Sequence, residues 1–261
     1  MGAPPRPPPR LGQHFLFDPG ILGRIADAAL LGPDDVVLEI GPGKGTLTRE
    51  LARRAREVVA IEADRRLAAA LEAAPPAPNV RVVTGDALRV DWPRADVIAG
   101  NIPYQITSPL IERALTPPRP RRIVFLVQRE VADRLAAPPG ASDYGALSAG
   151  VQLVAEVERL FAVRAGAFRP APRVASALVR ITPREHPVAR TPAEERAARA
   201  LIRAAFQRRR QQLQRVLREA YGLDARQAAA ALAAVGVEPA ARPEALSPEA
   251  FVALARRLGT P

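Results

Sequence analysis

The sequence has no cysteine, only two histidines and a single lysine among its 261 residues. The absence of cysteine excludes disulfide scaffolds, thiolate nucleophiles, iron–sulfur clusters and cysteine-ligated zinc. Because His14 and His186 are the only imidazoles, a zinc site or a histidine-based triad would need an unusual arrangement, and we expect no metal. Chemistry in this chain therefore depends on carboxylates, amides, backbone groups or a bound cofactor.

Long apolar runs are also missing. No stretch of the sequence approaches the about 20 apolar residues that are needed to span a bilayer. Residues 1–10 (MGAPPRPPPR) lack the hydrophobic core of a signal peptide. We expect these ten residues to form a mobile, proline-rich tail on a cytoplasmic protein that does not contact membranes.

The charge of the chain is unbalanced. Thirty-eight Lys and Arg residues face 27 Asp and Glu residues, which leaves a net charge of +11. An excess of this size favours a polyanionic partner, with nucleic acid ahead of anionic lipid. More than half of the excess lies in residues 183–261, which hold 14 arginines and 8 acidic residues.

Short β-branched runs alternate with Ala-, Leu- and Arg-rich segments from residue 36 onward. This alternation predicts a doubly wound, mostly parallel sheet. Two further runs follow the last of these helices, so we expect an antiparallel pair at the end of the sheet. The predicted strands are 36–40, 58–62, 80–83, 96–99, 123–127, 157–163 and 177–182, and the predicted helices between them are 46–55, 65–73, 108–115 and 130–136.

The pattern changes at about Pro183. Residues 182–187 have the composition of a linker, and every later segment has helical spacing. Two helix starts place a capping residue before a proline, at Thr191 and at Ser247. The sequence therefore predicts an α/β domain over residues 11–182 and a small, basic, all-helical domain over residues 183–261.

A glycine-rich turn links the first predicted strand of this alternation to its helix. Residues 39–46 (EIGPGKGT) provide glycines that let the chain turn tightly and let a ligand approach the backbone. The motif is not a P-loop, because Lys44 is followed by Gly45, and Thr46 replaces the third glycine of the dinucleotide fingerprint. Taken alone, the motif is equally compatible with an ordinary turn.

Acidic residues end the next two strands at the same edge of the predicted sheet. Glu62 follows the glycines by about 20 residues, the spacing at which an acid binds both ribose hydroxyls. Asp86 follows the third predicted strand, where its carboxylate can accept a hydrogen bond from an adenine amino group. Three strand ends directed at one crevice favour a nucleoside-containing cofactor.

The tetrapeptide at 101–104 (NIPY) follows the fourth strand. The exocyclic amine of adenine is a poor nucleophile because its lone pair is delocalised into the ring. The amide oxygen of Asn101 and the carbonyl of Ile102 can accept both amine hydrogens and align the lone pair with an electrophilic methyl group. Tyr104 can stack on the base. A rigid loop without chemistry is the alternative interpretation.

Taken together, these motifs resemble the class I S-adenosylmethionine-dependent methyltransferases, and within them the small-subunit (16S) ribosomal RNA adenine N6,N6-dimethyltransferases. The resemblance also covers a Phe-x-Pro-x-Pro-basic-Val-x-Ser signature. The residues that carry it are 12–16 (GQHFL), 39–48, Glu62, 85–86, 101–104, 144–148 (YGALS) and 168–176 (FRPAPRVAS).

The resemblance implies a fold, a reaction and a set of site residues. It implies a Rossmann-like sheet and dimethylation of N6 of two adjacent adenines in the terminal hairpin of small-subunit RNA, a step in ribosome biogenesis. Tyr104 and Phe168 would enclose the flipped adenine, and Asn101 and Tyr104 would be the catalytic residues. The positions that correspond to the family's cofactor contacts are His14, Leu16, Gly41, Glu62, Asp86 and Asn101.

The helical domain is the expected RNA contact. The family's Arg-Arg-Lys-x-Leu-x-Asn run corresponds to Arg208, Arg209 and Arg210, followed by a less similar stretch. A stripe of arginines at helical spacing in this domain also fits a solvated helix face, so phosphate contact rests on the domain's net charge. The stripe consists of Arg203, Arg208, Arg210, Arg215 and Arg218. We expect a monomer that acts on small-subunit RNA or on a partly assembled subunit.

Two other functions remain open from the sequence. One is the related large-subunit (23S) RNA adenine methylase that confers macrolide resistance, which shares the Asn-x-Pro-Tyr motif. The other is a non-catalytic RNA-binding assembly or transcription factor with a methyltransferase fold. The segments 144–148 and 168–176 resemble the small-subunit enzyme more than the first alternative, and the intact glycine turn, Glu62 and Asn101 weigh against the second.

Overall fold

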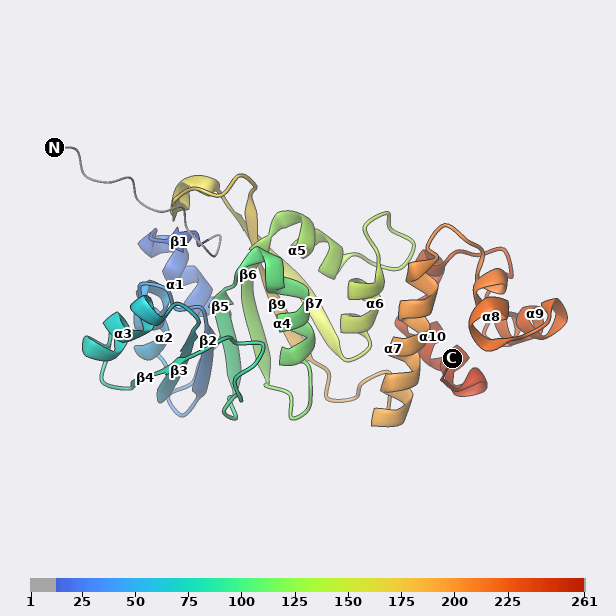
Figure 1. Cartoon of the computed structure of the whole chain (residues 1–261), viewed down its shortest axis with the longest axis horizontal. Coiled ribbons are helices and arrows are strands. Elements are labelled where there is room, and N and C mark those ends of the chain that lie inside the picture. The colour runs from blue at the N-terminus through green and yellow to red at the C-terminus, as the bar shows by residue number, and fades with distance from the viewer. Residues whose placement is uncertain (1–12, 261) are drawn as a thin grey trace. The chain divides into compact units, whose positions relative to one another are not determined.

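Apolar segments form the strands of a seven-stranded sheet (Figure 1). The computed structural model describes residues 13–260, so the tail predicted for residues 1–10 lies outside the described residues. The strand order is β4-β3-β2-β5-β6-β9-β7, and β1 and β8 form a separate two-stranded sheet. The strands are β1 (Phe15–Leu16), β2 (Val36–Ile40), β3 (Glu57–Glu62), β4 (Val80–Thr84), β5 (Val97–Asn101), β6 (Arg122–Gln128), β7 (Ala155–Val163), β8 (Phe168–Arg169) and β9 (Ser176–Pro183).

The strand directions confirm the predicted mostly parallel sheet. The pairs β3–β4, β2–β3, β2–β5 and β5–β6 are parallel, and β9 runs antiparallel to β6. Parallel strands are covered on both faces, which explains why their sequences are nearly continuous apolar runs. Residues 123–127 of β6, for example, are completely buried.

Helices follow most of the strands. None of those between residues 13 and 260 is both long and apolar enough to cross a membrane. The helices are α1 (Pro19–Ala28), α2 (Thr46–Ala52), α3 (Arg65–Ala73), α4 (Thr107–Ala114), α5 (Arg129–Ala136), α6 (Ala146–Gln152), α7 (Pro192–Gln207), α8 (Leu213–Tyr221), α9 (Ala225–Ala233) and α10 (Pro248–Leu258).

The two helix starts expected from the sequence are present. Thr191 caps α7 by accepting a hydrogen bond from the backbone N–H of Glu194 at 3.2 Å. Ser247 caps α10 by accepting one from Ala250, also at 3.2 Å. In both helices a proline occupies the first turn, where its missing N–H costs no hydrogen bond.

The chain forms two compact units. The first contains the residues up to Ala132 together with Glu158–Thr182, and the second contains Asp133–Val157 with the residues from Pro183 onward. Residues 133–157, which fall inside the predicted 11–182 domain, thus group with the C-terminal helices. Their aromatic contact explains this, since the Tyr144 ring lies 6.1 Å from that of Phe206 on α7. The division into a catalytic and an RNA-contacting domain stays a prediction.

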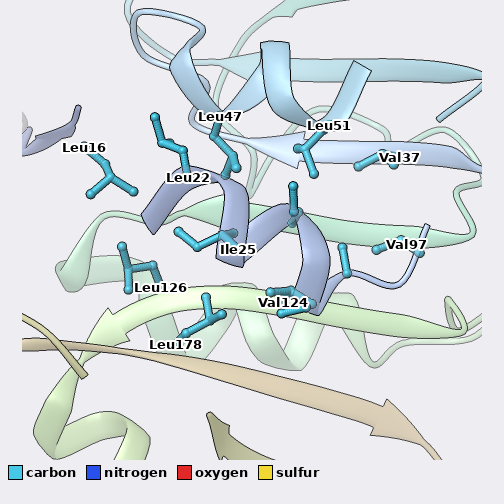
Figure 2. Packing of buried hydrophobic residues seen from close by; sticks show 14 of the residues in the cluster. Leu16, Leu22, Ile25, Val37, Leu47, Leu51, Val97, Val124, Leu126 and Leu178 are labelled. Carbon is cyan, nitrogen blue, oxygen red and sulfur yellow. The ribbon is translucent and has the colours of Figure 1, made fainter. Parts of the chain in front are cut away.

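Helices α1 and α2 supply one layer of the core of the first unit. Figure 2 shows Leu22 and Ile25 of α1 packed over apolar side chains of the sheet. Their spacing of three residues places both on the buried face of the helix. The other labelled members of this cluster are Leu16, Val37, Leu47, Leu51, Val97, Val124, Leu126 and Leu178.

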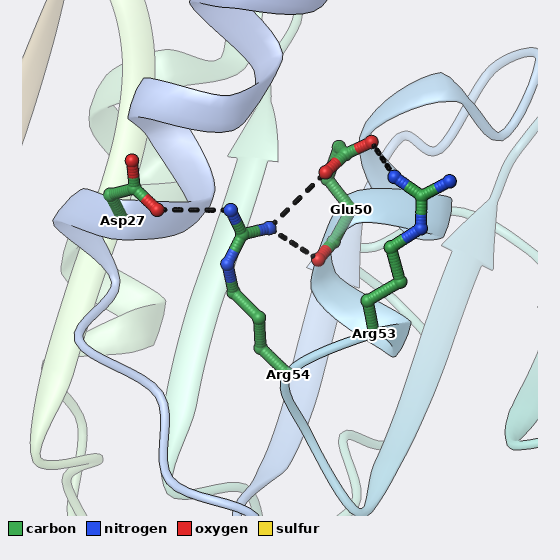
Figure 3. Close-up of polar contacts among 4 residues, drawn as sticks. All are labelled: Asp27, Glu50, Arg53 and Arg54. Carbon is green, nitrogen blue, oxygen red and sulfur yellow. Dashed lines mark hydrogen bonds and ion pairs between the residues drawn. The ribbon is translucent and has the colours of Figure 1, made fainter.

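Arg54 joins the two helices of this layer on their outer side (Figure 3). Its guanidinium donates to Asp27 of α1 at 2.9 Å and to Glu50 of α2 at 3.2 Å. The same guanidinium donates to the backbone carbonyl of Glu50 at 2.8 Å, and Arg53 pairs with the Glu50 carboxylate as well. These contacts fix α2 next to α1, and with it the glycine-rich turn that precedes α2.

Candidate functional site

A cavity of about 480 Å³ opens at the carboxyl ends of β2, β3, β4 and β5. Ligands in doubly wound sheets bind at this edge. The structure brings together in the cavity lining all of the cofactor-contact positions expected from the sequence, together with Tyr104. These are His14, Leu16, Gly41, Glu62, Asp86 and Asn101.

The glycine-rich turn lines the cavity at the end of β2. Gly41, Gly43 and Gly45 have φ values of 71°, 59° and 74°, in the left-handed region that favours glycine. A Cβ atom on Gly45 would also lie 2.7 Å from the side chain of Pro76. The turn therefore depends on its glycines, and it exposes backbone groups to the cavity as the sequence predicted.

Glu62 fixes the position of this turn. Its side chain is 4% exposed, and its two carboxylate oxygens accept hydrogen bonds of 2.9 Å from the backbone N–H groups of Gly43 and Asp64. Burial raises the pKa of Glu62, while the N–H groups of Asp64 and Gly43 oppose that shift. Each oxygen keeps a lone pair, so the carboxylate can also receive two hydroxyl groups of a sugar.

A second carboxyl group, Glu39, lies in the wall beneath the turn. Burial, reinforced by the neighbouring Glu62, raises its pKa to about 8. The side chain of Thr48 opposes this rise in the pKa of Glu39, but within residues 13–260 neither the Oε2 atom nor the hydroxyl of Thr48 has a partner at full hydrogen-bond geometry. The cavity therefore contains one acid that is mainly protonated at neutral pH and carries an unsatisfied polar atom.

Asp86 lies at the opposite rim and is the most exposed of the predicted contacts. Its Oδ1 atom accepts a hydrogen bond of 2.9 Å from the backbone N–H of Leu88, and its Oδ2 atom lies 3.5 Å from Arg89. These contacts hold the carboxylate in a tight turn after β4. Its position is compatible with the expected hydrogen bond to an amino group.

The segment 13–16 closes the cavity on one side. Phe15 and Leu16 pair with Arg169 and Phe168 of β8, and the hydroxyl of Thr46 donates to the carbonyl of Leu16 at 2.9 Å. The imidazole Nδ1 of His14 donates to the carbonyl of Pro170 at 2.8 Å. The segment is thus tied both to the glycine-rich turn and to the loop after β8.

Asn101 ends β5 with its amide directed by this segment. The amide nitrogen donates to the backbone carbonyl of His14 at 2.8 Å. In the described part of the chain its Oδ1 atom has no donor, so the oxygen is available as an acceptor. The next residue, Ile102, is 1% exposed, which anchors the loop that carries Asn101.

Tyr104 and Phe168, which the resemblance places on either side of a base, have different environments. Tyr104 lines the cavity, and its ring lies 6.0 Å from the His14 ring at an interplanar angle of 30°. Phe168 is not among the residues that line the cavity; it is 2% exposed and belongs to the same core cluster as Leu16. The structure therefore pairs Tyr104 with His14, and a base contact of Phe168 stays a prediction.

The three arginines expected to contact RNA follow α7 in the second unit. Arg208 pairs with Glu219 at 2.8 Å, and Arg209 lies 3.8 Å from Glu244 and also donates to the carbonyl of Ser142. Arg210 is exposed. Two of the three guanidinium groups thus have acidic neighbours within the protein.

The site also contains residues that were not among the contacts expected from the sequence. Phe15 and Gln13 line the cavity, and Ser176 shares a hydrogen bond of 2.7 Å with the hydroxyl of Tyr104. The signature at 168–176 contains Ser176, but nothing in its spacing indicates that this serine meets a residue 72 positions earlier.

Comparison with known proteins gives one consistent family. The model of the family described as ribosomal RNA adenine dimethylase matches residues 8–259. A protein from Geobacter metallireducens named ribosomal RNA small subunit methyltransferase A is 41% identical over 95% of this chain and 94% of its own length. A protein of the same name from Gloeobacter violaceus is 44% identical over 95% and 92%.

Two solved structures have the same architecture over nearly the whole chain. A dimethyladenosine transferase from Plasmodium falciparum has a TM-score of 0.81 at 29% identity, covering 92% of this chain and 96% of that one. The 23S rRNA methyltransferase ErmE has a TM-score of 0.73 at 34% identity, covering 94% and 99%. The class I methyltransferase fold expected from the sequence is therefore confirmed.

Proposed function

The chain belongs to the ribosomal RNA adenine dimethylase family, and from this premise we propose that it dimethylates N6 of two adjacent adenines in the terminal hairpin of small-subunit ribosomal RNA. It is an rRNA adenine dimethyltransferase. The observation that carries the proposal is the geometry of Asn101, whose amide nitrogen donates to the carbonyl of His14 and whose oxygen has no donor among residues 13–260.

Asn101 acts on the amine of the target base. Its oxygen accepts one N6 hydrogen and the carbonyl of Ile102 accepts the other, so that the nitrogen lone pair is localised and points along the line of transfer. Because the bond to His14 fixes which end of the amide faces the cavity, the acceptor is preorganised. Tyr104 holds the extruded base by stacking, since a base inside a helix cannot reach this depth.

The cavity residues fit S-adenosylmethionine, the methyl donor of this family. When bound, it supplies an electrophilic methyl group on a sulfonium. In this proposal the carboxylate of Glu62, which lines the cavity, accepts from both ribose hydroxyls, and Asp86 accepts from the adenine amine. The unsatisfied Oε2 atom of Glu39 offers a further acceptor. A cavity of about 480 Å³ has the size of a nucleoside cofactor site.

The family relationship favours the small-subunit substrate over the large-subunit alternative. Relatives that are 41% and 44% identical along almost their whole length carry a small-subunit name, while ErmE, named for 23S rRNA, is 34% identical. We further propose that the protein is a cytoplasmic monomer whose partner is free small-subunit RNA or a partly assembled subunit. Phe168 and the arginines 208–210 remain candidates for RNA contacts.

Substitution of Asn101 tests the proposed reaction. In Asn101→Ala we expect methyl transfer to fall about 100-fold or more, because a preorganised acceptor is lost, while the affinity for S-adenosylmethionine changes little. Radiolabelled methyl transfer to unmodified small subunits and isothermal titration measure the two quantities. An unimpaired rate in Asn101→Ala contradicts the mechanism.

Nucleoside mapping tests the substrate. Deproteinised small- and large-subunit RNA are incubated with enzyme and labelled donor, and the modified positions are mapped. We expect dimethyladenosine at two adjacent positions of the small-subunit RNA. Label confined to the large-subunit RNA favours the macrolide-resistance type of enzyme, and RNA binding without binding of the donor favours a non-catalytic protein.

A further inference from the structure

We propose that Ser176 is a positioning residue for methyl transfer, which holds the ring of Tyr104 in the orientation that receives the target base. The inference rests on the proposed function, because the orientation of the Tyr104 ring matters only if this ring receives the target base. The observation that supports this inference is the hydrogen bond of 2.7 Å between the hydroxyls of Ser176 and Tyr104.

Ser176 is a fixed point of the fold. It is completely buried and begins β9, where it lies opposite Gln128 of β6 in the antiparallel ladder. The preceding residue, Ala175, accepts a backbone hydrogen bond of 2.9 Å from Arg129. A side chain as short as serine on such a strand has few alternative positions, so its hydroxyl is a rigid anchor.

Tyr104 needs such an anchor. It begins a single turn of 3₁₀ helix, residues Tyr104–Ile106, directly after Pro103, and it is only half-buried. An aromatic ring at the wall of a cavity otherwise has open space on one side. The bond to Ser176 fixes the far end of the ring, so that both its tilt and its depth in the cavity are determined.

The hydroxyl of Tyr104 stays neutral at the site. Burial raises its pKa, so the phenol stays protonated at neutral pH and forms a neutral hydrogen bond. A proton shuttle would require a group with a pKa near the working pH. The geometry therefore gives this hydroxyl a mechanical role, which it performs together with Ser176.

The loop between β8 and β9 also fixes His14, whose ring lies next to that of Tyr104. Pro170, at the other end of the loop between β8 and β9, accepts the hydrogen bond from His14, and the carbonyl of His14 orients Asn101. This loop and Ser176, which follows it, thus influence both Tyr104 and Asn101. Ser176 bonds to Tyr104 directly, and Pro170 acts on Asn101 through His14. Of these links, only the Ser176 link can be removed by deleting a single oxygen atom.

Kinetics of three variants form the first part of the test. In Ser176→Ala we expect kcat/KM for small-subunit RNA to fall about tenfold, because a misplaced group loses the alignment that binding supplies, with an unchanged affinity for S-adenosylmethionine. Tyr104→Phe keeps the ring but removes its tether, so it should lose a similar factor. The double variant should lose no more than either single one, as expected for one shared contact.

A fluorine spectrum of the full chain forms the second part. The protein has only three tyrosines, so incorporation of 3-fluorotyrosine gives three resonances, and Tyr104→Phe identifies the one from Tyr104. We expect Ser176→Ala to shift or broaden this resonance and to leave the other two unchanged. Ser148→Ala is the matched control, because Ser148 is equally buried and its hydroxyl contacts Gly145 and Arg134 outside the cavity.

The outcomes separate this inference from the proposed function. A Ser176→Ala protein with the kinetics and the Tyr104 resonance of the Ser148→Ala control overturns the inference, and so does a double variant whose losses multiply. If the unsubstituted protein methylates no adenine, the proposed function fails. The fluorine spectrum then still decides whether Ser176 holds Tyr104, since an unchanged Tyr104 resonance in Ser176→Ala rejects that as well.

Discussion

Burial raises the pKa of both glutamates at the cavity, but their hydrogen bonds oppose this shift to different extents. Glu62 receives backbone N–H groups on both oxygens, which stabilises its charged form. Glu39 is 1% exposed and has an unpartnered oxygen, so its neutral form is favoured and its pKa rises to about 8. Buried acids with perturbed pKa values are a common feature of functional sites.

The raised pKa of Glu39 predicts a dependence of stability on pH. Since the folded pKa lies above the unfolded value of 4.5, this group contributes stability that is fully present below pH 4.5 and is lost as the pH rises toward about 8. The slope is at most about 1.4 kcal/mol per pH unit. Urea unfolding of Glu39→Gln between pH 5 and pH 8 should show a flatter profile than the unsubstituted protein.

The control for this measurement is Glu57→Gln, which removes a partly exposed carboxylate from β3, where it lies 3.4 Å from Arg81. We expect that variant to keep the slope of the unsubstituted protein. If all three proteins lose stability in parallel as the pH rises, the burial of Glu39 is not the source of the slope.

Glu62→Gln should weaken binding of S-adenosylmethionine without abolishing folding. The amide keeps one oxygen for Gly43 or Asp64 but loses the charge that strengthens bonds to the ribose hydroxyls. We expect the Kd from isothermal titration to rise about tenfold, which corresponds to about 1.4 kcal/mol. Asp64→Asn, which alters the cap of α3 outside the cavity, serves for comparison, and an equal loss of affinity there would refute a specific role of Glu62.

Residues at strand ends were predictable, and contacts between distant loops were not. Glu62, Asp86 and Asn101 follow apolar runs, and the carboxyl ends of parallel strands meet at one edge. The bond between Ser176 and Tyr104 depends on how two loops pack, for which no local pattern exists. The same reason explains Phe168, whose motif gives its residue type but not the burial of its ring against Leu16.

At the scale of elements, the close approach of β5 to β2 determines where Asn101 lies. A Cβ atom on Gly100 would stand 2.4 Å from the backbone carbonyl oxygen of Ile40. Gly100→Ala should therefore push the strand ends apart and destabilise the protein by about 1–3 kcal/mol, and it should lower methyl transfer by displacing Asn101. Thermal unfolding and the transfer rate measure both effects.

The matched substitution is Gly23→Ala in α1. Apart from the helix's own backbone and the adjacent residues, no heavy atom of the described residues lies within 4 Å of the Cβ position there, and Ala is favoured over Gly in a helix by about 1 kcal/mol. We expect this variant to be as stable as the unsubstituted protein or more so, with normal transfer. A Gly100→Ala protein that behaves like Gly23→Ala would argue against a steric limit at β5.

The strands and helices between residues 36 and 136 lie close to their predicted bounds. Their apolar residues recur with a clear strand or helix period. The pair β1–β8 has two residues in each strand, which is too short for any period. Helix α1 does carry a signal, since Asp18 caps it and Pro19 occupies its first turn. This cap pattern, combined with Leu22 and Ile25 on one face, is sufficient to predict the helix.

At the scale of the whole molecule, the net charge of +11 predicts that RNA affinity falls steeply with salt, because each phosphate contact releases counterions. Arg210, which is exposed, should contribute more than Arg208, which must leave Glu219 to bind a phosphate. In Arg210→Ala we expect weaker binding and a salt slope reduced by about 1, measured by fluorescence anisotropy at several salt concentrations.

Arg53→Ala removes one positive charge from the first unit, at a position that is exposed and paired with Glu50. Its effect on the salt slope should be smaller than that of Arg210→Ala. If both variants showed the same salt dependence of RNA affinity, RNA binding would depend only on the total charge of the protein. The excess of charge was visible in the sequence, but the ion pairs that occupy Arg208 and Arg209 appear only once the chain is folded.

The pairing of β1 with β8 also sets an order for biosynthesis. One wall of the cavity consists of residues near the start of the chain, yet their backbone partners are Phe168 and Arg169. A nascent polypeptide on a translating ribosome cannot enclose the donor until these later residues have emerged. This wall of the cavity therefore forms only after residues 168 and 169 have been synthesised.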